Sequence, residues 1–373
     1  MKRKNNLYEK ILNTENALKM YKTIKQNCKN KKEVYRFSLN LNQNIMEILE
    51  KLYNENYKFD RYRIFIIKEP KYRLIMSEKI EDKIVNHLVA KYILLPALDG
   101  SLIDANVATR YEKGSGHAFK LFNRQVQRLM RENKEIYVLK IDISKYFYNI
   151  DHEICMKLVE KKIKDPRAIK ITKEIIETTN HAYINKEVKY MVAKEIKRVR
   201  ALNITEKEKN IKINQLNSIP LYYNGKGLPI GNMTSQILAV YYLNEIDHFI
   251  KEKLKFKNYI RYMDDLVIMD TDKEKLKDGY NQIKKMIEDV KLQTNKKSNL
   301  YRLSNGITFL GYTFKTHGKK LIIRYNTNTS RRIARRLKNL KRFDYEMYLK
   351  SKGSYKGFLE KCNTGLYKKM MEL

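Results

Sequence analysis

The stretch Tyr259–Met269, which reads YIRYMDDLVIM, places two adjacent acids between two apolar arms. This pattern predicts a β-hairpin whose tight turn holds Asp264 and Asp265. An Asp-Asp pair in a polar turn is often turn chemistry alone. Arms this hydrophobic, however, have to be buried on at least one face, so the two charges would lie near a core. A divalent cation is the natural compensation for them.

A third carboxylate comes from an upstream stretch that also has strand character. Glu135–Ser144 predicts a strand in which Leu139, Ile141 and Ile143 share one face and Asp142 lies on the other. Two metal ions roughly 3.5 to 4 Å apart, bridged by carboxylates from separate strands, lower the pKa of an attacking hydroxyl and stabilise a leaving pyrophosphate. Hard oxygen ligands suit Mg²⁺.

The composition indicates a polyanionic partner. The 373 residues include 78 Lys and Arg against 42 Asp and Glu, a formal net charge of +36 that is spread along the whole chain. The longest uninterrupted apolar stretch, Ile237–Leu243, is far shorter than the roughly 18 residues of a membrane-spanning helix. The basic N-terminus lacks the apolar core of a secretory signal, so we expect a cytoplasmic protein without a membrane partner.

Hydrophobic periodicity predicts most of the elements. Residues 1–60 are helical in pattern, and strands are expected at 63–67 and 72–76 around a basic turn containing Pro70. Apolar residues from Ile80 to Leu95 predict a helix that Pro96 ends or interrupts. Asp151 is expected to cap the helix that follows it.

Two charged segments stand out further along the chain. Residues 186–217 contain few large apolar side chains and are interpreted as a solvated insertion or an arm facing nucleic acid. From Ser330 onward, Ile333, Leu337 and Leu340 form a narrow apolar stripe on a helix whose other faces are basic. The three cysteines are isolated and show no metal-ligand spacing with the histidines.

Several motifs in one order resemble those of reverse transcriptases. Tyr262–Asp265 resembles their YxDD box, and Asp142–Phe147 resembles their first catalytic motif. Gly227–Gln236 precedes the box and Phe309–Phe314 follows it, as in this family. The resemblance covers roughly residues 30 to 370 and implies an α+β fold of the right-hand polymerase type, with a ferredoxin-like antiparallel palm sheet and an N-terminal helical extension.

The resemblance also implies subdomain boundaries. The N-terminal helical extension would occupy residues 1–60 and the fingers 61–134. The palm would occupy 135–315, with interleaved fingers helices and the charged insertion at about 186–217. A helical thumb would occupy 316–373. No Cys-rich or His-rich nuclease element follows, so we expect no RNase H or endonuclease domain.

The catalytic roles implied by the resemblance centre on the acids. Asp142 and Asp264 would be the principal ligands of two Mg²⁺ ions, with Mn²⁺ as an alternative, and Asp265 the supporting carboxylate. Ile143, next to Asp142, is assigned to the same metal site. Lys297, in the stretch Asn295–Ser298, would help to protonate the leaving pyrophosphate, although a chance match competes in a chain this rich in lysine.

The nucleotide-binding residues implied by the resemblance are Lys68, Lys71, Arg73, Phe147, Ile230 and Gln236. The three basic residues would contact the triphosphate, and a solvated basic turn is the alternative. Phe147 would lie beneath the sugar and exclude a 2′-hydroxyl, and an ordinary core phenylalanine is the alternative. The primer- and template-binding residues implied are Arg110, Phe309, Gly311, Tyr312, Arg331 and Arg335.

One position departs from the family pattern. Most members have glutamine where this chain has Ile230, and that glutamine hydrogen-bonds the incoming nucleotide. The turn Ile230-Gly231-Asn232, followed by Thr234-Ser235-Gln236 and the YMDD box, is most similar to reverse transcriptases of diversity-generating retroelements. This similarity implies error-prone copying of a template-repeat RNA into cDNA from dNTPs, together with a basic accessory protein.

Three other functions are weighed against this one. Antiphage defence reverse transcriptases share the palm motifs, and the long interval from Asp142 to Gly227 keeps that group open. An RNA-directed RNA polymerase could use the same acids, but Phe147 and the YMDD form argue against it. A non-catalytic nucleic-acid-binding component is disfavoured by the complete set of aspartates.

Overall fold

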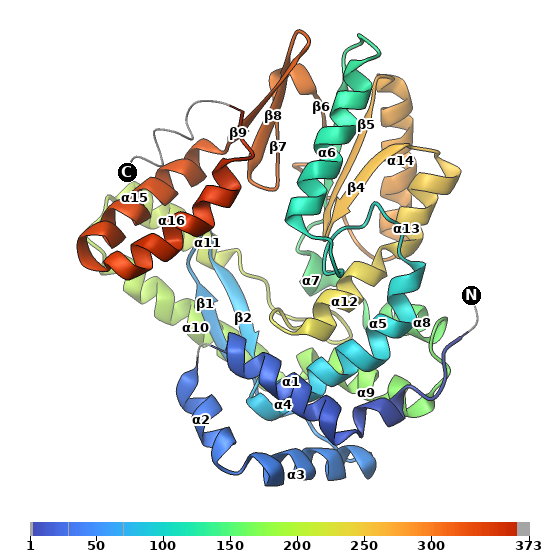
Figure 1. Ribbon diagram of the computed structural model, residues 1–373, viewed down its shortest axis with the longest axis vertical. Helices are drawn as coiled ribbons and strands as arrows, with labels where there is room; N and C mark the ends of the chain where they lie inside the picture. Colours follow the sequence, from blue (N-terminus) through green and yellow to red (C-terminus); the bar gives the residue numbers. More distant parts are fainter. Residues whose placement is uncertain (1–2, 29, 70, 364–373) are drawn as a thin grey trace. The chain divides into compact units, whose positions relative to one another are not determined.

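The computed structural model describes residues 3–28, 30–69 and 71–363, which form two compact units (Figure 1). Unit 1 takes the described residues within Met1–Asp104, Ile143–Asp247 and Met286–Gln293. Unit 2 takes those within Ala105–Asp142, His248–Lys285 and Thr294–Leu373. The chain passes between the units several times, and two of these crossings fall within α13 (Asn244–His248) and α14 (Lys273–Asp289).

Unit 2 is organised around a four-stranded antiparallel sheet with the order β4-β5-β3-β6. Its strands are β3 (Tyr137–Asp142), β4 (Asn258–Tyr262), β5 (Asp265–Asp270) and β6 (Asn299–Arg302). Helices separate β3 from β4 and β5 from β6, whereas a tight turn joins β4 to β5. This is the ferredoxin-like βαββαβ arrangement, so the predicted antiparallel sheet and α+β class are confirmed.

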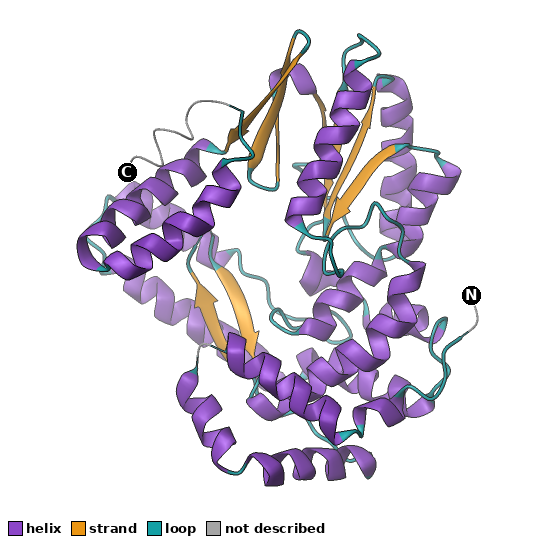
Figure 2. Cartoon of the chain, in the orientation of Figure 1, coloured by secondary structure: helices purple, strands orange, loops and turns teal. Residues whose placement is uncertain are grey.

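The strands β4 and β5 are largely apolar and buried along most of their length, whereas the edge strand β6 is partly exposed. Ile260, Val267 and Met269 share a core with α6 (Ser115–Met130), which packs against β4 and β5 (Figure 2). Phe119 and Phe122 of α6 place their rings 5.5 and 4.3 Å from that of Phe314. The aromatic cluster therefore joins the sheet to the strands that follow it in the chain.

Those following strands form a second antiparallel sheet in unit 2, with the order β7-β8-β9. It contains β7 (Ile307–Phe309), β8 (Tyr312–His317) and β9 (Lys320–Tyr325), and it precedes the helices α15 (Thr327–Phe343) and α16 (Tyr345–Leu359). Ile333 and Leu337 of the predicted stripe are buried against Tyr348 and Leu359, and Leu340 is partly buried beside them. The predicted amphipathic helix is confirmed.

Unit 1 is mainly helical, and its N-terminal part agrees with the helical pattern predicted for residues 1–60. Ile45, Ile48, Leu49 and Leu52 are buried along one face, as expected. The helices of this unit are α1 (Thr14–Asn27), α2 (Lys31–Leu39), α3 (Leu41–Tyr53), α4 (Ile80–Leu88), α5 (Leu95–Leu98), α7 (Tyr146–Asn149), α8 (His152–Glu160), α9 (Pro166–Glu177), α10 (Ala182–Arg200), α11 (Glu206–Asn217) and α12 (Met233–Tyr242). None of the helices in the described part of the chain is long and apolar enough to cross a membrane.

The two predicted strands near residue 70 form a hairpin, β1 (Arg63–Ile67) paired with β2 (Arg73–Ser77). Pro70, expected in their turn, lies outside the described residues. The charged segment at 186–217, expected as a solvated insertion or an arm facing nucleic acid, is mostly exposed and forms a helical pair, α10 and α11, of which α10 packs on β1. Val188, Val199 and Leu216 are buried there. A few apolar residues are enough to pack such a helical pair onto its neighbours when helical spacing places them on one side.

The helix predicted from Ile80 to Leu95 does not keep one register. A π-helical turn, η2 (Val89–Leu94), interrupts it between α4 and α5. The wider turn rotates the following residues, so Ile93 and Leu94 are buried and Tyr92 is only partly buried. The predicted capping of α8 by Asp151 is confirmed, since Asp151 Oδ1 accepts a hydrogen bond of 3.1 Å from the Ile154 N–H.

Two acids are buried inside unit 1 near the start of α4. Asp82 accepts hydrogen bonds from the Tyr57 hydroxyl at 2.7 Å and the Asp60 N–H at 3.0 Å. Glu78, 6% exposed, accepts from the amides of Asn86 and Asn232. Burial, assisted by the nearby Asp82 carboxylate, raises the pKa of Glu78 to about 8. Glu78 is therefore largely protonated at neutral pH.

The raised pKa of Glu78 predicts that stability falls as pH rises from about 5 to 8. In this range the folded chain retains a proton that the unfolded chain, with an ordinary carboxyl pKa, has released. The contribution to the free energy of unfolding is up to about 1.4 kcal/mol per pH unit. The Glu78→Gln variant carries no titrating proton, so its stability should fall less over the same range. Urea unfolding of both proteins at pH 5 to 8 checks this, and parallel pH profiles would contradict it.

Candidate active site

The predicted hairpin is present, and a two-residue turn separates its strands. Tyr262 at the end of β4 pairs with Asp265 at the start of β5, so Met263 and Asp264 form the turn. Met263 has φ of +56°, a left-handed conformation that costs a non-glycine residue on the order of 1 to 3 kcal/mol. The structure thus places Asp264 in the turn and Asp265 on the strand.

Arg261 supports this turn from inside the fold. Its side chain is completely buried, and its Nη1 donates a hydrogen bond of 3.0 Å to the Met263 carbonyl. Its backbone is also held, because Arg261 N donates to the Ala105 carbonyl at 2.9 Å and Val107 N donates to the Arg261 carbonyl at 3.1 Å. These contacts stabilise the strained conformation of the turn.

Asp142 lies opposite Asp265 on the neighbouring strand. The pairing of β3 with β5 brings Asp142 and Asp265 together as direct partners. The Asp142 N–H donates to Ser298 Oγ at 3.1 Å, Ser298 Oγ donates back to the Asp142 carbonyl at 3.1 Å, and Asn295 N donates to the same carbonyl at 2.7 Å. Lys297 lies between these two anchoring residues and is exposed. The structure thus brings Asp142 next to Asp265 and places the segment of Lys297 against the backbone of Asp142, and the catalytic roles of these residues stay a prediction.

Lys140 is a residue of this site that the sequence analysis missed. Its Nζ lies 3.3 Å from Asp265 Oδ1 and donates to the Thr308 carbonyl at 3.4 Å. Strand alternation puts Lys140 on the same face as Asp142, two residues away. That spacing was available in the sequence, but nothing in it indicated that the ammonium would contact the carboxylate of a different strand.

The carboxylates of Asp142, Asp264 and Asp265 are chemically suited to bind a divalent metal ion. Carboxylate oxygens are the hard ligands that Mg²⁺ prefers, and the Lys140 ammonium shows that Asp265 attracts a cation. Within the described residues, no group of three or more His, Cys, Asp or Glu side chains is already arranged to hold a metal ion. The assignment of metal ligands therefore stays a prediction, as does that of Ile143, whose side chain is buried.

The predicted nucleotide-binding residues of unit 1 are joined through their backbones. The Phe147 carbonyl accepts a hydrogen bond of 2.7 Å from Leu228 N, and the Ile230 carbonyl accepts one of 2.8 Å from Met76 N. Arg73 begins the strand that contains Met76. Phe147, the Leu228–Gly231 turn and β2 are consequently neighbours within this unit.

Glycine is required at two positions of the Gly227–Gln236 motif. Gly231 has φ of +141°, and a Cβ there would lie 2.5 Å from the Met76 carbonyl oxygen. Gly227 has φ of +92°, and its Cβ would lie 2.6 Å from the Tyr222 ring. Both backbone conformation and space exclude a side chain at these positions, so Gly231 allows the turn to approach β2 and Gly227 allows it to approach Tyr222.

The side chains predicted to bind the nucleotide differ in their surroundings. Lys68 forms an ion pair of 2.5 Å with Glu195 of α10, which engages its charge within the protein. Lys71 and Arg73 are exposed, and their side chains make no hydrogen bond or ion pair to another described residue. Phe147 is half-buried with its ring 5.8 Å from that of Tyr146, and Gln236 is half-buried on α12.

The predicted primer and template residues fall into two groups. Phe309 and Tyr312 are buried, and the Tyr312 hydroxyl donates to the Phe358 carbonyl at 3.0 Å, so a primer would meet the backbone at Gly311, where φ is +85°. Arg331 and Arg335 are exposed on α15. Arg110 Nη1 donates to the Asn106 carbonyl at 3.2 Å. Thr364, near the end of the resemblance, lies outside the described residues.

Comparison with known proteins gives a family match and similar solved structures. Residues 66–314, more than half of the chain, match the family described as reverse transcriptase (RNA-dependent DNA polymerase). Among solved structures, the chain is similar to apo telomerase from Candida tropicalis truncated from its C-terminal domain, with a TM-score of 0.46, 13% identity, and coverage of 72% of this chain and 55% of that one. The chain thus spans about half the length of that protein. No curated protein sequence matches it.

The family match bears on two of the expectations drawn from the sequence. It confirms the α+β polymerase fold. It also agrees with the expected enzyme class, since the matched family is described as RNA-dependent DNA polymerase. The chain belongs to the reverse transcriptase (RNA-dependent DNA polymerase) family.

Proposed function

We propose that this protein copies an RNA template into DNA and that Asp142, Asp264 and Asp265 form its catalytic centre. The observation that carries the proposal is the pairing of Asp142 with Asp265 across β3 and β5, beside a turn that presents Asp264. Three acids from two strand ends are the donor set that two-metal nucleotidyl transfer needs. The family match covers all three.

The residues of unit 2 would divide the work of the reaction. Asp142 and Asp264 would hold two Mg²⁺ or Mn²⁺ ions, with Asp265 in support. When bound, such ions lower the pKa of the primer hydroxyl and stabilise negative charge on the phosphates. Ser298 and Asn295 fix the backbone of Asp142, and the exposed Lys297 beside them would donate a proton to the departing pyrophosphate.

The residues of unit 1 would select and hold the incoming deoxynucleotide. Phe147 would exclude a ribose 2′-hydroxyl, and the connection from its carbonyl to Leu228 supports a shared site with Ile230. Lys71 and Arg73 have charges without a protein partner among the described residues, which suits contact with a triphosphate. Lys68 would have to leave Glu195 to do the same.

The basic surfaces would hold the nucleic acid. We assign fingers to 61–134, palm to 135–315 and thumb to 316–373, after a helical extension at 1–60. The thumb helix α15 presents Arg331 and Arg335 to solvent opposite its buried stripe, which suits contact with the phosphates of template and primer. Arg110 and the backbone at Gly311 would also contact these strands.

Within the family, a diversity-generating retroelement is the biological setting that the motifs favour. The turn Ile230-Gly231-Asn232 carries this inference, and it implies a template-repeat RNA, error-prone synthesis and a basic accessory protein. Antiphage defence is the second candidate. The observation that favours it is the long interval between Asp142 and Gly227, which includes the α10–α11 helical pair.

The first test is primer extension on an RNA template with Mg²⁺, comparing deoxynucleotides with ribonucleotides. We expect wild type to make DNA and Asp264→Asn to lose at least about a thousandfold in rate, which corresponds to roughly 4 kcal/mol of transition-state stabilisation. Asp270→Asn, at the far end of β5, should retain activity and serves as the control. DNA synthesis by Asp264→Asn, or none by wild type, would overturn the proposal.

A second test of the proposed function concerns Lys140 and the affinity for metal ions. A metal ion at Asp265 has to displace or repel the ammonium 3.3 Å away, so Lys140→Gln should bind Mn²⁺ more tightly, on the order of tenfold or about 1.4 kcal/mol. Electron paramagnetic resonance of free Mn²⁺ measures this without catalysis. Lys319→Gln removes the same charge from the β8–β9 turn and should leave the affinity nearly unchanged. Unchanged or weaker binding by Lys140→Gln would show that Lys140 does not compete.

The third prediction concerns fidelity. Ile230 has no polar group for the incoming nucleotide, whereas the glutamine of most family members does. Ile230→Gln should reduce misincorporation about tenfold, because a hydrogen bond to substrate discriminates by about 1.4 kcal/mol or more. Sequencing cDNA copied from an adenine-rich RNA checks this, with Ile230→Leu as the apolar control. Equal error spectra for all three enzymes would refute the role of this side chain.

A further inference from the structure

Five polar side chains of unit 1 form a buried hydrogen-bonded network behind the Leu228–Gly231 turn. Glu78 and Tyr62 are each 6% exposed, Asn232 is 1% exposed, and Asn86 and Thr234 are fully buried. They come from four separate segments: the approach to β1, the end of β2, helix α4 and the start of α12. A buried polar group costs free energy unless it is hydrogen-bonded, so each contact in the network matters.

Asn232 is the branch point of this network. Its Nδ2 donates hydrogen bonds to Glu78 Oε1 at 2.6 Å and to the Tyr62 hydroxyl at 2.9 Å. The amide of Asn86 donates to the same Glu78 oxygen, and Thr234 Oγ1 donates to Asn86 Oδ1 at 2.6 Å. Because Asn232 directly follows Gly231, the network is attached to the turn itself.

Two contacts attach the turn to β2 and the residue that follows it, and they are two residues apart along each of the two segments. The first is the backbone hydrogen bond of 2.8 Å from Met76 N to the Ile230 carbonyl. The second is the contact between the side chains of Glu78 and Asn232. One attachment would leave the turn free to pivot, whereas two define its orientation against the strand that begins with Arg73.

We propose that Asn232 and Glu78 are positioning residues for the incoming nucleotide, because their mutual hydrogen bond fixes the turn of Ile230 relative to β2. The inference rests on the proposed function, in which Ile230 and Arg73 contact the nucleotide. Neither residue touches the substrate, and their effect passes through the backbone of the turn. Loss of the contact should therefore weaken nucleotide binding and leave the chemical step at the three aspartates largely unchanged.

The state of Glu78 suits this role. Burial raises its pKa, and the groups that face it are Asp82, Lys83 and Asn86 of α4 together with Asn232 and Tyr62. The neutral carboxyl keeps one oxygen that accepts from both amides and buries no charge. Glutamine preserves that oxygen, whereas leucine does not. The conservative and disruptive substitutions of Glu78 are thus expected to differ in their effect.

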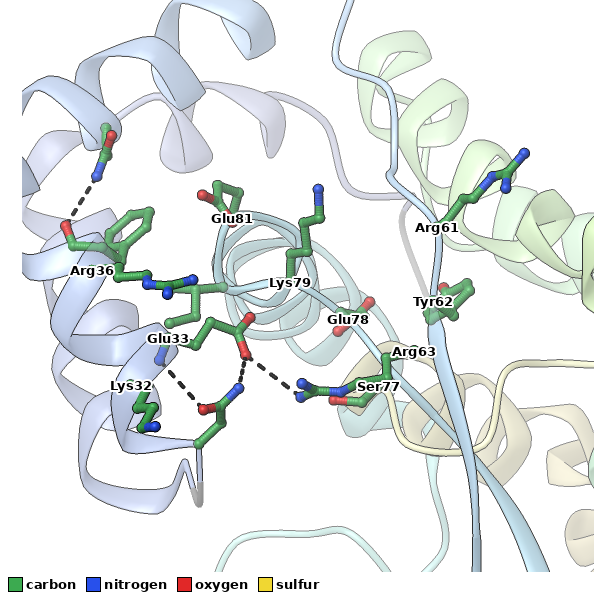
Figure 3. Close-up of a pocket in the computed structure, with 14 residues that line it drawn as sticks. Lys32, Glu33, Arg36, Arg61, Tyr62, Arg63, Ser77, Glu78, Lys79 and Glu81 are labelled. Atoms are coloured by element: carbon green, nitrogen blue, oxygen red, sulfur yellow. Dashed lines mark hydrogen bonds and ion pairs between the residues drawn. The ribbon is translucent and has the colours of Figure 1, made fainter. Parts of the chain in front are cut away.

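The network borders a pocket of about 680 Å³ in unit 1 (Figure 3). Glu78 and Tyr62 lie on the side of this pocket across from Lys32, Glu33 and Arg36 of α2. The pocket has mixed charges, and Glu33 pairs with Arg63 at 3.5 Å. Glu78 and Tyr62 thus form the edge of the network that lines this pocket, whereas Asn232 lies behind them and is 1% exposed.

The test compares steady-state kinetics of the full chain with single deoxynucleotides. Asn232→Leu keeps the approximate size of the side chain but removes its polar atoms, and Glu78→Leu removes the acceptor. Both should raise KM for the nucleotide about tenfold or more with little change in kcat, whereas Glu78→Gln should stay close to wild type. Thr172→Val, which removes a buried hydroxyl within α9, controls for general destabilisation and should leave KM unchanged.

A second readout does not require catalysis. The Met76 amide is protected by the Ile230 carbonyl, so its hydrogen exchange should accelerate in Asn232→Leu and Glu78→Leu and remain slow in Glu78→Gln. An unchanged KM together with a protected Met76 amide would overturn the positioning role. If wild type made no DNA, the proposed function would fail instead, and the exchange of Met76 would still decide whether these side chains hold the turn.

Discussion

The repulsion between acids at the end of a buried sheet is the constraint on which the site depends. Asp142 and Asp265 face each other at the ends of β3 and β5, whose other residues are largely buried. Like charges this close are unfavourable unless a cation compensates them. Lys140 supplies part of this compensation, because its ammonium contacts Asp265. The apolar strands hold the acids together, and the acids in turn create the need for a cation.

The same sheet explains how a strained turn persists. Met263 adopts a left-handed φ, and the fully buried Arg261 donates to its carbonyl. A buried guanidinium is expensive to desolvate, so its contacts must be good for the fold to tolerate it. The strand on one side of the turn therefore stabilises the conformation that presents Asp264. Strain at the site is compensated by hydrogen bonds from the core beneath it.

Much of this could be predicted from the sequence, because periodic apolar residues predict strands and helices directly. The hairpin of Tyr259–Met269, the strand before Asp142 and the capped helix after Asp151 are all present. Contacts between distant segments could not be predicted in this way. Lys140 and Asp265 are separated by more than a hundred residues, and only the β3–β5 register brings them together. Pro96 indicated that the helix would be interrupted, because it has no N–H to donate, but it did not indicate that the interruption would be a π-helical turn followed by α5.

The average composition of a segment predicted its burial less reliably than the spacing of its apolar residues did. Residues 186–217 are highly charged and mostly exposed, yet Val188, Val199 and Leu216 are buried in a core that they share with β1 and β2. The aromatic residues of the Phe309–Phe314 motif show the opposite case. Their position suggested contact with nucleic acid, but Phe309 and Tyr312 pack in the core. A sequence motif indicates which segment would contact nucleic acid. Burial of its side chains then shows that its backbone, and not those side chains, is available for the contact.

The network around Asn232 bears on how an enzyme with isoleucine at position 230 would make errors. A missing side-chain donor and a mobile turn are different defects. The turn here is held by Met76 and by the Glu78–Asn232 contact, and Gly231 allows the close approach. The backbone is therefore well positioned even though the side chain has no polar group to offer. Any loss of discrimination would arise from the absent hydrogen bond at Ile230, within a turn whose geometry is fixed.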